Sequence, residues 1–393
     1  MNDSTTSPRG LLPLTAILFL SYLCVGLSLT SVSLQVTRHL GLANAWSGLA
    51  VGIAFVATVL TRGVAGRISD QRGPKVAATR GLAIYVAGLG IAALAGLPSF
   101  GPVAAIALLL AGRVVLGLGE SLVTVGVVAW GIGLVGAQQS GRVLAWVGAA
   151  LYGAVAAGGP LGVLLFYKLG FAGAMATAAA LPALGLLAAA RVRGVAPLAG
   201  AARPSIWRVV GRVGRHGAIV CLQGIGFAAI GAFFALHFLR QQWPFAGLGL
   251  TAFGGGFVLV RVLFGQLPDR FGGLRVAIAS LAVEVAGQSL IWAAHGPAGA
   301  LAGAFLTGLG CSLVFPSMGR EVVRVVEPHL RGTALGAFAA FQDVAYALTG
   351  PLAGLLADAA GVRSVFLLGA GAATLGLALA IGLRRGAGVS VPA

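Results

Sequence analysis

The chain has 393 residues, of which 58% are hydrophobic and only 9% are charged, and its mean hydropathy is +0.98. An average soluble domain has about 25% charged residues, so this composition excludes soluble enzymes, nucleic-acid-binding proteins and disordered scaffolds. The net charge of +17 lies in short gaps between apolar runs, which is the distribution found in the loops of membrane proteins. We therefore interpret the chain as an all-α polytopic membrane protein without a nucleic-acid partner.

Twelve apolar stretches are long enough to cross a bilayer, for which a helix needs about 20 residues. Breaks at charged residues, glycine and proline separate them. The predicted spans are Leu11–Val36, Trp46–Ala65, Val76–Leu97, Val103–Val127, Val143–Tyr167, Ala172–Ala190, Gly217–Phe238, Leu248–Phe264, Val276–Ala294, Ala298–Met318, Gly332–Leu356 and Ser364–Leu383, the fourth with an extension toward Leu134. Residues 11–190 and 216–383 then form two six-helix bundles. Tails at 1–10 and 384–393 and a basic linker at 191–215 complete the chain.

The basic residues predict which side each loop faces. Nineteen of the 26 Lys and Arg residues lie in the gaps on one side and four lie on the other, which places both termini in the cytoplasm. Within the linker, Arg208, Arg212 and Arg215 share one helical face. This segment is either a short helix lying in the membrane interface or a solvated connection between the bundles.

The two predicted bundles share sequence patterns, which indicates an internal duplication. The residues Arg62, Gly66, Asp70 and Gly73 recur 199 positions later as Arg261, Gly265, Asp269 and Gly272. Ala111–Val123 and Ala302–Val314 are identical at eight of thirteen positions, with an offset of 191. Gly159-Pro160 recurs at this second offset as Gly350-Pro351. Duplicated helical bundles around a central site are typical of secondary transporters.

Several of these motifs carry a resemblance to a known family. The loop segment Gly66–Lys75, its copy Gly265–Gly273 and the Arg113-x3-Gly117-x-Gly119 pattern resemble signatures of the major facilitator superfamily. Ser312–Gly354 is similar to the YhhS-type branch of bacterial efflux permeases. The Gly159-Pro160 bend in the fifth span resembles the motif of proton-coupled exporters, although its copy in the eleventh span also fits a bend kept by duplication. The resemblance implies twelve transmembrane helices in two pseudo-symmetric six-helix bundles, with proton-coupled export.

Two charged residues of the fourth span are candidates for the transport chemistry, because burying a charge in a membrane is costly. Arg113 and Glu120 lie at i and i+7 and share a helical face. The duplicate has Ala304 and Cys311 at these positions, so the fold does not need both charges. We expect Glu120 to bind a proton or a cationic substrate group, with Arg113 favouring its ionised form. The alternative is a buried structural ion pair.

The second bundle has two further candidate carboxyl groups. Asp343 lies in the middle of the eleventh span, where a carboxyl can carry a proton. Glu284 in the ninth span either has a similar role or helps the helices pack. We expect other polar groups to line a central cavity, namely Tyr22, Gln35, Gln223, His237, Gln342 and Tyr346.

The repeated loop motif is a candidate gate on the cytoplasmic side. Its expected members are Arg62, Gly66, Asp70, Arg72, Gly73, Arg261, Gly265, Asp269 and Gly272. A charge network that holds this side shut is favoured over direct substrate contact. The resemblance implies that the aspartate faces the start of the eleventh span, where a helix N-terminus stabilises a carboxylate.

We therefore expect a monomeric secondary transporter of the bacterial inner membrane that exchanges a small organic molecule for protons by alternating access. One alternative is proton-coupled uptake of a polar solute. Another is a transporter-like sensor or partner platform that transports nothing. No enzyme activity, cofactor or metal ion is expected, since Cys24, Cys221 and Cys311 lie inside apolar runs without the spacing of metal ligands.

Overall fold

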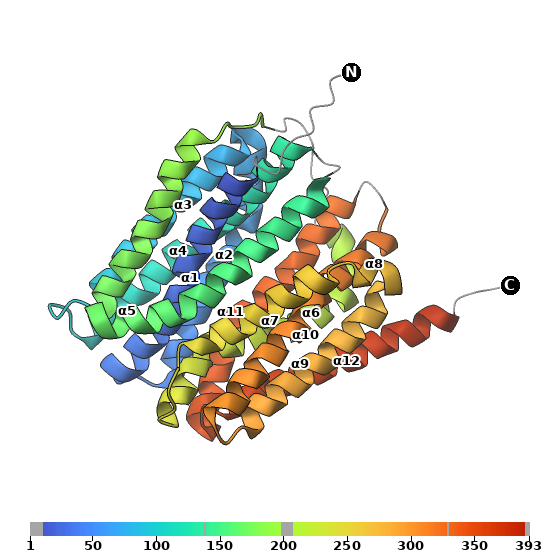
Figure 1. Cartoon of the computed structure of the whole chain (residues 1–393). Coiled ribbons are helices and arrows are strands. Elements are labelled where there is room, and N and C mark those ends of the chain that lie inside the picture. Colours follow the sequence, from blue (N-terminus) through green and yellow to red (C-terminus); the bar gives the residue numbers. More distant parts are fainter. Residues whose placement is uncertain (1–10, 137–138, 198–206, 328–329, 390–393) are drawn as a thin grey trace. The chain divides into compact units, whose positions relative to one another are not determined.

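The computed structural model describes residues 11–136, 139–197, 207–327 and 330–389, and helices are the only regular elements in these ranges (Figure 1). They are α1 (Leu12–Leu34), the π-helix η2 (Gln35–His39), α2 (Asn44–Arg72), α3 (Pro74–Leu94), α4 (Pro102–Val135), α5 (Ser140–Arg191), α6 (Trp207–Arg240), α7 (Leu248–Phe264), α8 (Leu267–Phe271), α9 (Gly273–Ala293), α10 (Pro297–Val325), α11 (Arg331–Ala360) and α12 (Ser364–Val389). The expected tail at 1–10 and linker residues 198–206 lie outside the described ranges.

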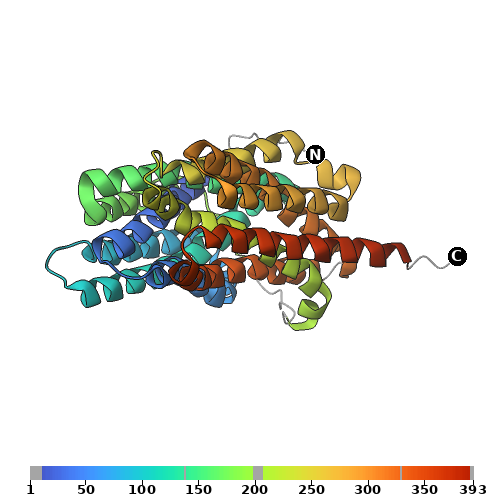
Figure 2. The same cartoon turned by 90° about the horizontal axis from the view of Figure 1, so that it is seen from below.

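The helices confirm the expected all-α membrane fold. Nine of those described are long and apolar enough to cross a bilayer, and α12 runs as one uninterrupted helix (Figure 2). The helix α7, with 17 residues, has the predicted bounds. The long helix α5 contains two predicted spans, because Gly170 breaks its helical backbone with φ 69° and ψ 177°. A φ in this region favours glycine, so the fifth and sixth spans turn into each other at that residue.

The described chain divides into two compact units. One unit contains the residues up to Gln35 together with Ile53–Ala201, and the other contains Val36–Gly52 together with the residues from Ala202 onward. The first unit therefore holds α1, most of α2 and α3 to α5. The second holds α6 to α12 and also the part of η2 after Gln35, with the start of α2.

The internal duplication is visible in how glycines bring helices together within each unit. A β-carbon at Gly88 of α3 would lie 2.9 Å from the carbonyl oxygen of Gly112 on α4. The duplicate pair, Gly287 of α9 and Gly303 of α10, repeats this approach at 2.8 Å. Gly287 follows Gly88 by 199 positions and Gly303 follows Gly112 by 191 positions, which are the two offsets of the sequence repeat. Close backbone contact at small residues is the usual packing between helices in lipid.

The basic segment before the seventh span differs from its prediction. Residues 207–215, expected in the linker, belong to α6 and continue directly into the span, so they form no separate interfacial helix. Val209 and Val213 lie one turn apart and are fully buried against the ends of α10 and α11. Burial of this apolar face stabilises the added turns, while Arg212 forms an exposed ion pair with Glu327 at 2.8 Å.

A carboxylate at the end of α11 holds the first turn of α2. Asp358 accepts hydrogen bonds from the backbone N–H and the side-chain amide of Asn44, at 2.9 and 2.6 Å, and from the N–H of Ala45 at 2.9 Å. Arg240 of α6 donates to the Asn44 side-chain oxygen at 3.3 Å. The first N–H groups of a helix lack partners within the helix, so these bonds fix the start of α2 on α11.

The glycine contacts predict an uneven response to added methyl groups. A β-carbon at Gly308 of α10 would collide with the carbonyl oxygen of Phe253 on α7, whereas one at Gly255 would meet nothing within 4 Å. We expect Gly308→Ala to cost about 1–3 kcal/mol by overpacking and to lower the unfolding midpoint in detergent. The control Gly255→Ala should leave that midpoint unchanged or raise it, because alanine is the better helix former. Equal midpoints for the two variants would contradict the packing described.

Candidate functional site

A polar cluster lies inside the first unit, between α1 and α4. The Tyr22 hydroxyl donates to Glu120 Oε1 at 3.2 Å and lies 3.0 Å from the Thr124 hydroxyl. Six residues further along α1, the Ser28 hydroxyl accepts a hydrogen bond from Arg113 at 2.9 Å. The side chains of Arg113 and Glu120 are buried, with exposed fractions of 1% and 5%. The structure thus brings three of the predicted residues together and adds Ser28 and Thr124.

The charges of this cluster compensate each other. Arg113 and Glu120 lie two helical turns apart on α4 and interact electrostatically. Opposite charges attract strongly in a medium of low dielectric constant, so each offsets part of the cost of burying the other. Tyr85 of α3 is also fully buried beside Glu120, and its hydroxyl has no hydrogen-bond partner among the described residues. This arrangement can take up one proton or one cationic group at Glu120.

A second polar group lies where α6 and α11 pack. The Gln342 amide donates to the Gln223 side-chain oxygen at 3.5 Å, and the neighbouring Asp343 has an exposed fraction of 8%. The ring of Tyr346, one turn further along α11, packs edge-on against Phe227 with centroids 5.2 Å apart. Two predicted amides, a predicted carboxyl and a predicted phenol therefore share this region.

The other predicted polar residues have separate surroundings. Gln35 is buried and donates to the Ala95 carbonyl oxygen at 3.1 Å, which ties the end of α1 to the end of α3. His237 lies among aromatic rings, with centroids 5.4 Å from those of Trp243 and Phe366. Glu284 and Gln288 are fully buried on α9. Gln35 and His237 join neither of the two clusters, whereas Glu284 is linked to Gln223 of the second cluster through the Cys311 thiol.

The fifth-span bend is supported by hydroxyl groups of α1. Pro160 cannot donate a hydrogen bond inside α5, and a proline ring crowds the carbonyl group four residues earlier. Next to this bend, the Thr30 hydroxyl donates to the Gly159 carbonyl oxygen at 3.3 Å, and that of Ser31 donates to Gly162 at 3.1 Å. The bend is therefore built into the packing of α1 on α5.

The backbone conformation explains why the repeated loop motif ends in glycine. Gly73 precedes α3 with φ 97°, and its copy Gly272 precedes α9 with φ 87°. Other residues rarely adopt this conformation, so both turns require glycine. Arg72 is exposed at the end of α2, Gly66 is buried within that helix, and Gly265 ends α7.

The charged residues of the second loop copy contact α10. Asp269 lies 3.4 Å from Arg320 near the end of α10. Arg261 donates to the Ser312 carbonyl oxygen at 2.8 Å, and its guanidinium lies over the ring of Phe257. In the first copy, Arg62 and Asp70 are both half-buried.

One charged residue in this region was missed by the sequence analysis. Glu321 of α10 is largely buried and accepts a hydrogen bond from the Gly273 N–H at 3.0 Å, at the first turn of α9. Arg320 and Arg324 lie 3.6 and 3.4 Å from its carboxylate. The signal was present, because a single acid stood between two arginines at the end of a predicted span.

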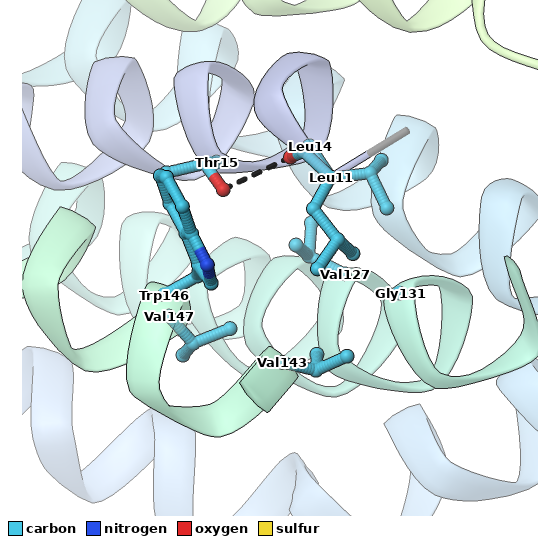
Figure 3. Close-up of a pocket in the computed structure, with 8 residues that line it drawn as sticks. All are labelled: Leu11, Leu14, Thr15, Val127, Gly131, Val143, Trp146 and Val147. Carbon is cyan, nitrogen blue, oxygen red and sulfur yellow. Dashed lines mark hydrogen bonds between the residues drawn. The ribbon is translucent and has the colours of Figure 1, made fainter. Parts of the chain in front are cut away.

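A small pocket lies between α1, α4 and α5 (Figure 3). Its lining is apolar except for Thr15, whose hydroxyl donates to the Leu11 carbonyl oxygen at 2.9 Å. The lining therefore offers little to recognise a polar ligand. In the described ranges, no three His, Cys, Asp or Glu side chains gather as metal ligands. The buried polar clusters remain the candidate site.

Comparison with known proteins gives one family. The sequence model of the Major Facilitator Superfamily matches residues 14–242 and 217–390. An uncharacterized MFS-type transporter of Salmonella typhimurium is 44% identical over 369 residues, covering 93% of this chain and 94% of the relative. An uncharacterized MFS-type transporter of Burkholderia mallei is 41% identical over 384 residues, covering 96% and 94%.

Solved structures share the fold at low sequence identity. A mutant of the nucleoside transporter NupG matches with a TM-score of 0.75 and 16% identity, covering 95% of this chain and 99% of that chain. The human organic anion transporter MFSD10 (TETRAN) matches with a TM-score of 0.70 and 16% identity, covering 95% and 100%. Identities this low carry no information on the substrate of this chain.

The buried charges predict a measurable coupling. Removing one partner of a buried ion pair costs about 3–5 kcal/mol, so Arg113→Leu should strongly lower the free energy of unfolding in detergent. The double variant Arg113→Leu with Glu120→Leu should recover part of this loss, with a coupling energy of about 0.5–3 kcal/mol. As a control, Arg113→Leu with Glu327→Leu should be additive, because Glu327 is exposed and belongs to the other unit. Additivity in both pairs would contradict the electrostatic pairing of Arg113 with Glu120.

Proposed function

The chain belongs to the Major Facilitator Superfamily, and from this premise we propose that it exports a small organic molecule in exchange for protons. Members of this family are membrane transporters and not enzymes, so transport across a membrane is the activity to be explained. Export, proton coupling and the organic substrate are the proposed parts. The YhhS-type branch is proposed from the likeness of Ser312–Gly354 to that group.

The buried cluster on α4 is the observation that carries this proposal. Glu120 can hold either a proton or the positive group of a substrate, but a single carboxylate does not hold both. Competition for one carboxylate makes binding of the proton and release of the substrate mutually dependent. Arg113, Tyr22 and Ser28 fix the site through the hydrogen bonds and the charge interaction already described. The duplicate unit has Ala304 and Cys311 in place of the two charges, so the duplicated fold does not require them.

Asp343 is the proposed carboxyl group for the second unit. Its burial, and its position beside Gln342 and Gln223, support a role in binding a proton or the polar part of a substrate. Proton uptake changes the charge of such a group, and a change in charge shifts an equilibrium between two conformations when it favours one of them. We propose that Glu120 and Asp343 drive alternating access in this way.

The repeated loops are the proposed gate on the cytoplasmic side. Asp70 and Asp269 would supply the acidic groups of this gate, with Arg62 and Arg261 as basic members. The contact between Asp269 and Arg320 supports an ionic role for the second copy. The bias of Lys and Arg supports cytoplasmic termini, and relatives in two bacteria support a place in the bacterial inner membrane. A monomer is the proposed transport unit.

Proton-coupled uptake of a polar solute uses the same groups with the opposite direction of substrate movement. Right-side-out and inverted membrane vesicles separate the two directions. With an inwardly directed proton gradient in the native orientation, export predicts substrate accumulation in inverted vesicles, and uptake predicts accumulation in right-side-out vesicles.

Proton flux in proteoliposomes tests the proposed coupling. The protein is reconstituted with a fluorescent pH probe and challenged with amphiphilic cations, sugars and small acids. A substrate should trigger proton flux in the unmodified protein. Glu120→Gln should abolish that flux, because a glutamine amide does not exchange a proton at neutral pH. Asp343→Asn is tested in parallel, and Glu327→Gln, at an exposed ion pair, is the control that should retain the flux.

Two results would contradict this proposal. Substrate movement without a pH change, in the unmodified protein and in each variant, would exclude proton coupling. Undiminished proton flux in both carboxyl variants would exclude Glu120 and Asp343 as coupling groups. A chain that binds a partner protein but moves none of the compounds would instead support a sensor or partner platform.

A further inference from the structure

The duplication relates two buried carboxyl groups that lie on different helices. At the offset of 199 that relates α3 to α9, Tyr85 corresponds to Glu284. At the offset of 191 that relates α4 to α10, Glu120 corresponds to Cys311. Each unit therefore has one carboxyl group at the same helix–helix contact, on α4 in the first unit and on α9 in the second.

The glycine contacts support this equivalence. A β-carbon at Gly119 of α4 would lie 3.0 Å from the Tyr85 nitrogen, and one at Gly310 of α10 would lie 2.5 Å from the Glu284 nitrogen. Gly119 and Gly310 are themselves related by the offset of 191. The same backbone approach thus places Tyr85 beside Glu120 in one unit and Glu284 beside Cys311 in the other.

The Glu284 side chain is enclosed within the second unit. Its exposed fraction is 0%, and a β-carbon at Gly226 of α6 would lie 2.6 Å from its Oε1. Glycine at 226 therefore leaves the space that the carboxyl occupies, while glycine at 310 lets the backbone and β-carbon of Glu284 lie against α10. Glu284 is eleven residues from the start of α9, or about 16 Å at 1.5 Å per residue. That depth is near the middle of a hydrocarbon core about 30 Å thick.

Neutral polar groups surround this carboxyl. The Cys311 thiol lies against it and also contacts Gln223 of α6. Gln288, one turn along α9, donates to the Gly226 carbonyl oxygen at 3.2 Å and to the Thr307 hydroxyl at 3.4 Å. These side chains form a polar pocket between α6, α9 and α10.

Within the part of the chain that the structure describes, no positive charge lies beside Glu284. The groups that face Glu284 are a thiol from α10, amides from α6 and α9, and the backbone of α6. In the described chain the Cys311 thiol is the one hydrogen-bonding group that the Glu284 carboxyl meets, and a thiol is only a weak donor. An ionised carboxylate without a cation at this depth is strongly unfavourable. The resting form of Glu284 therefore carries a proton.

We propose that Glu284 is a further proton-binding site, in addition to Glu120 and Asp343, at the helix contact of the second unit that corresponds to the contact of Glu120 in the first. The first site has its own cation in Arg113, whereas within the described residues no cation faces Glu284. This inference rests on the proposed proton-coupled transport for its role in the cycle, but not for the protonation itself.

The surroundings of Glu284 connect it to α11. Gln223 contacts Cys311 on one side and accepts a hydrogen bond from Gln342 on the other. Gln342 precedes Asp343 in the sequence. A movement of α11 against α6 would therefore alter the pocket that keeps Glu284 protonated, and loss of its proton would be linked to the state of α11.

Infrared spectroscopy of the full-length protein tests the protonation without any substrate. A protonated carboxyl has a carbonyl band that a carboxylate lacks. We expect the protein in lipid to show such a band at neutral pH and to lose it at alkaline pH. Glu284→Gln should remove this band selectively, whereas Glu327→Gln, at an exposed ion pair, should leave it in place. Identical spectra for Glu284→Gln and the unmodified protein at every pH would overturn the proposal.

A rescue variant separates proton binding from packing. Cys311 occupies the position that corresponds to Glu120, so adding Cys311→Glu to Glu284→Gln moves the carboxyl to the neighbouring helix. The band should return in this double variant and should be absent from the matched Cys311→Gln double variant. If both double variants fail to fold, the single variant Glu284→Gln still decides the result through its spectrum.

Transport measurements then distinguish this inference from the proposed function. If the unmodified protein moves substrate without protons, the proposed function fails, while the infrared result for Glu284 stands by itself. If the unmodified protein couples substrate movement to proton movement, Glu284→Gln should lose substrate-driven proton flux and retain substrate binding. Unchanged coupled flux in Glu284→Gln would overturn the role of Glu284 in the cycle.

Discussion

The approach of helix backbones at glycine is the constraint on which the rest of the structure depends. Lipid tails are as apolar as leucine, so the hydrophobic effect gives helices little reason to associate within a bilayer. Contact between backbones supplies dispersion energy instead. In this chain, the contact of Gly88 with Gly112 recurs as that of Gly287 with Gly303, so each half builds its helix packing by the same means.

Tight packing also determines where ionisable groups can lie. Arg113 and Glu120 share one face of α4, where hydroxyl groups of α1 reach them. The Glu284 side chain instead occupies space left by glycine at 226, and among the described residues no cation lies beside it. The two halves thus use one scaffold for two electrostatic environments. Divergence after duplication changed the side chains at the helix contacts while the contacts themselves were kept.

Much of this fold could be predicted from residue patterns, because lipid imposes long apolar helices. The bounds of α7 agree with the prediction, and the spacing of Arg113 and Glu120 placed both charges on one face. The start of α6 was missed, since six arginines obscured the apolar face formed by Val209 and Val213. The hydrogen bonds from Asn44 to Asp358 and from Gly273 to Glu321 join residues far apart in the sequence, so local patterns did not reveal them.

The glycine contacts also have a genetic consequence. Every single-base change in a glycine codon that alters the residue adds a β-carbon, so no conservative replacement is available at these positions. The chain has 63 glycines, and many of them face another backbone at less than the distance a β-carbon needs. The gene therefore has a broad target for inactivating point mutations, which extends well beyond the few positions that carry ionisable groups.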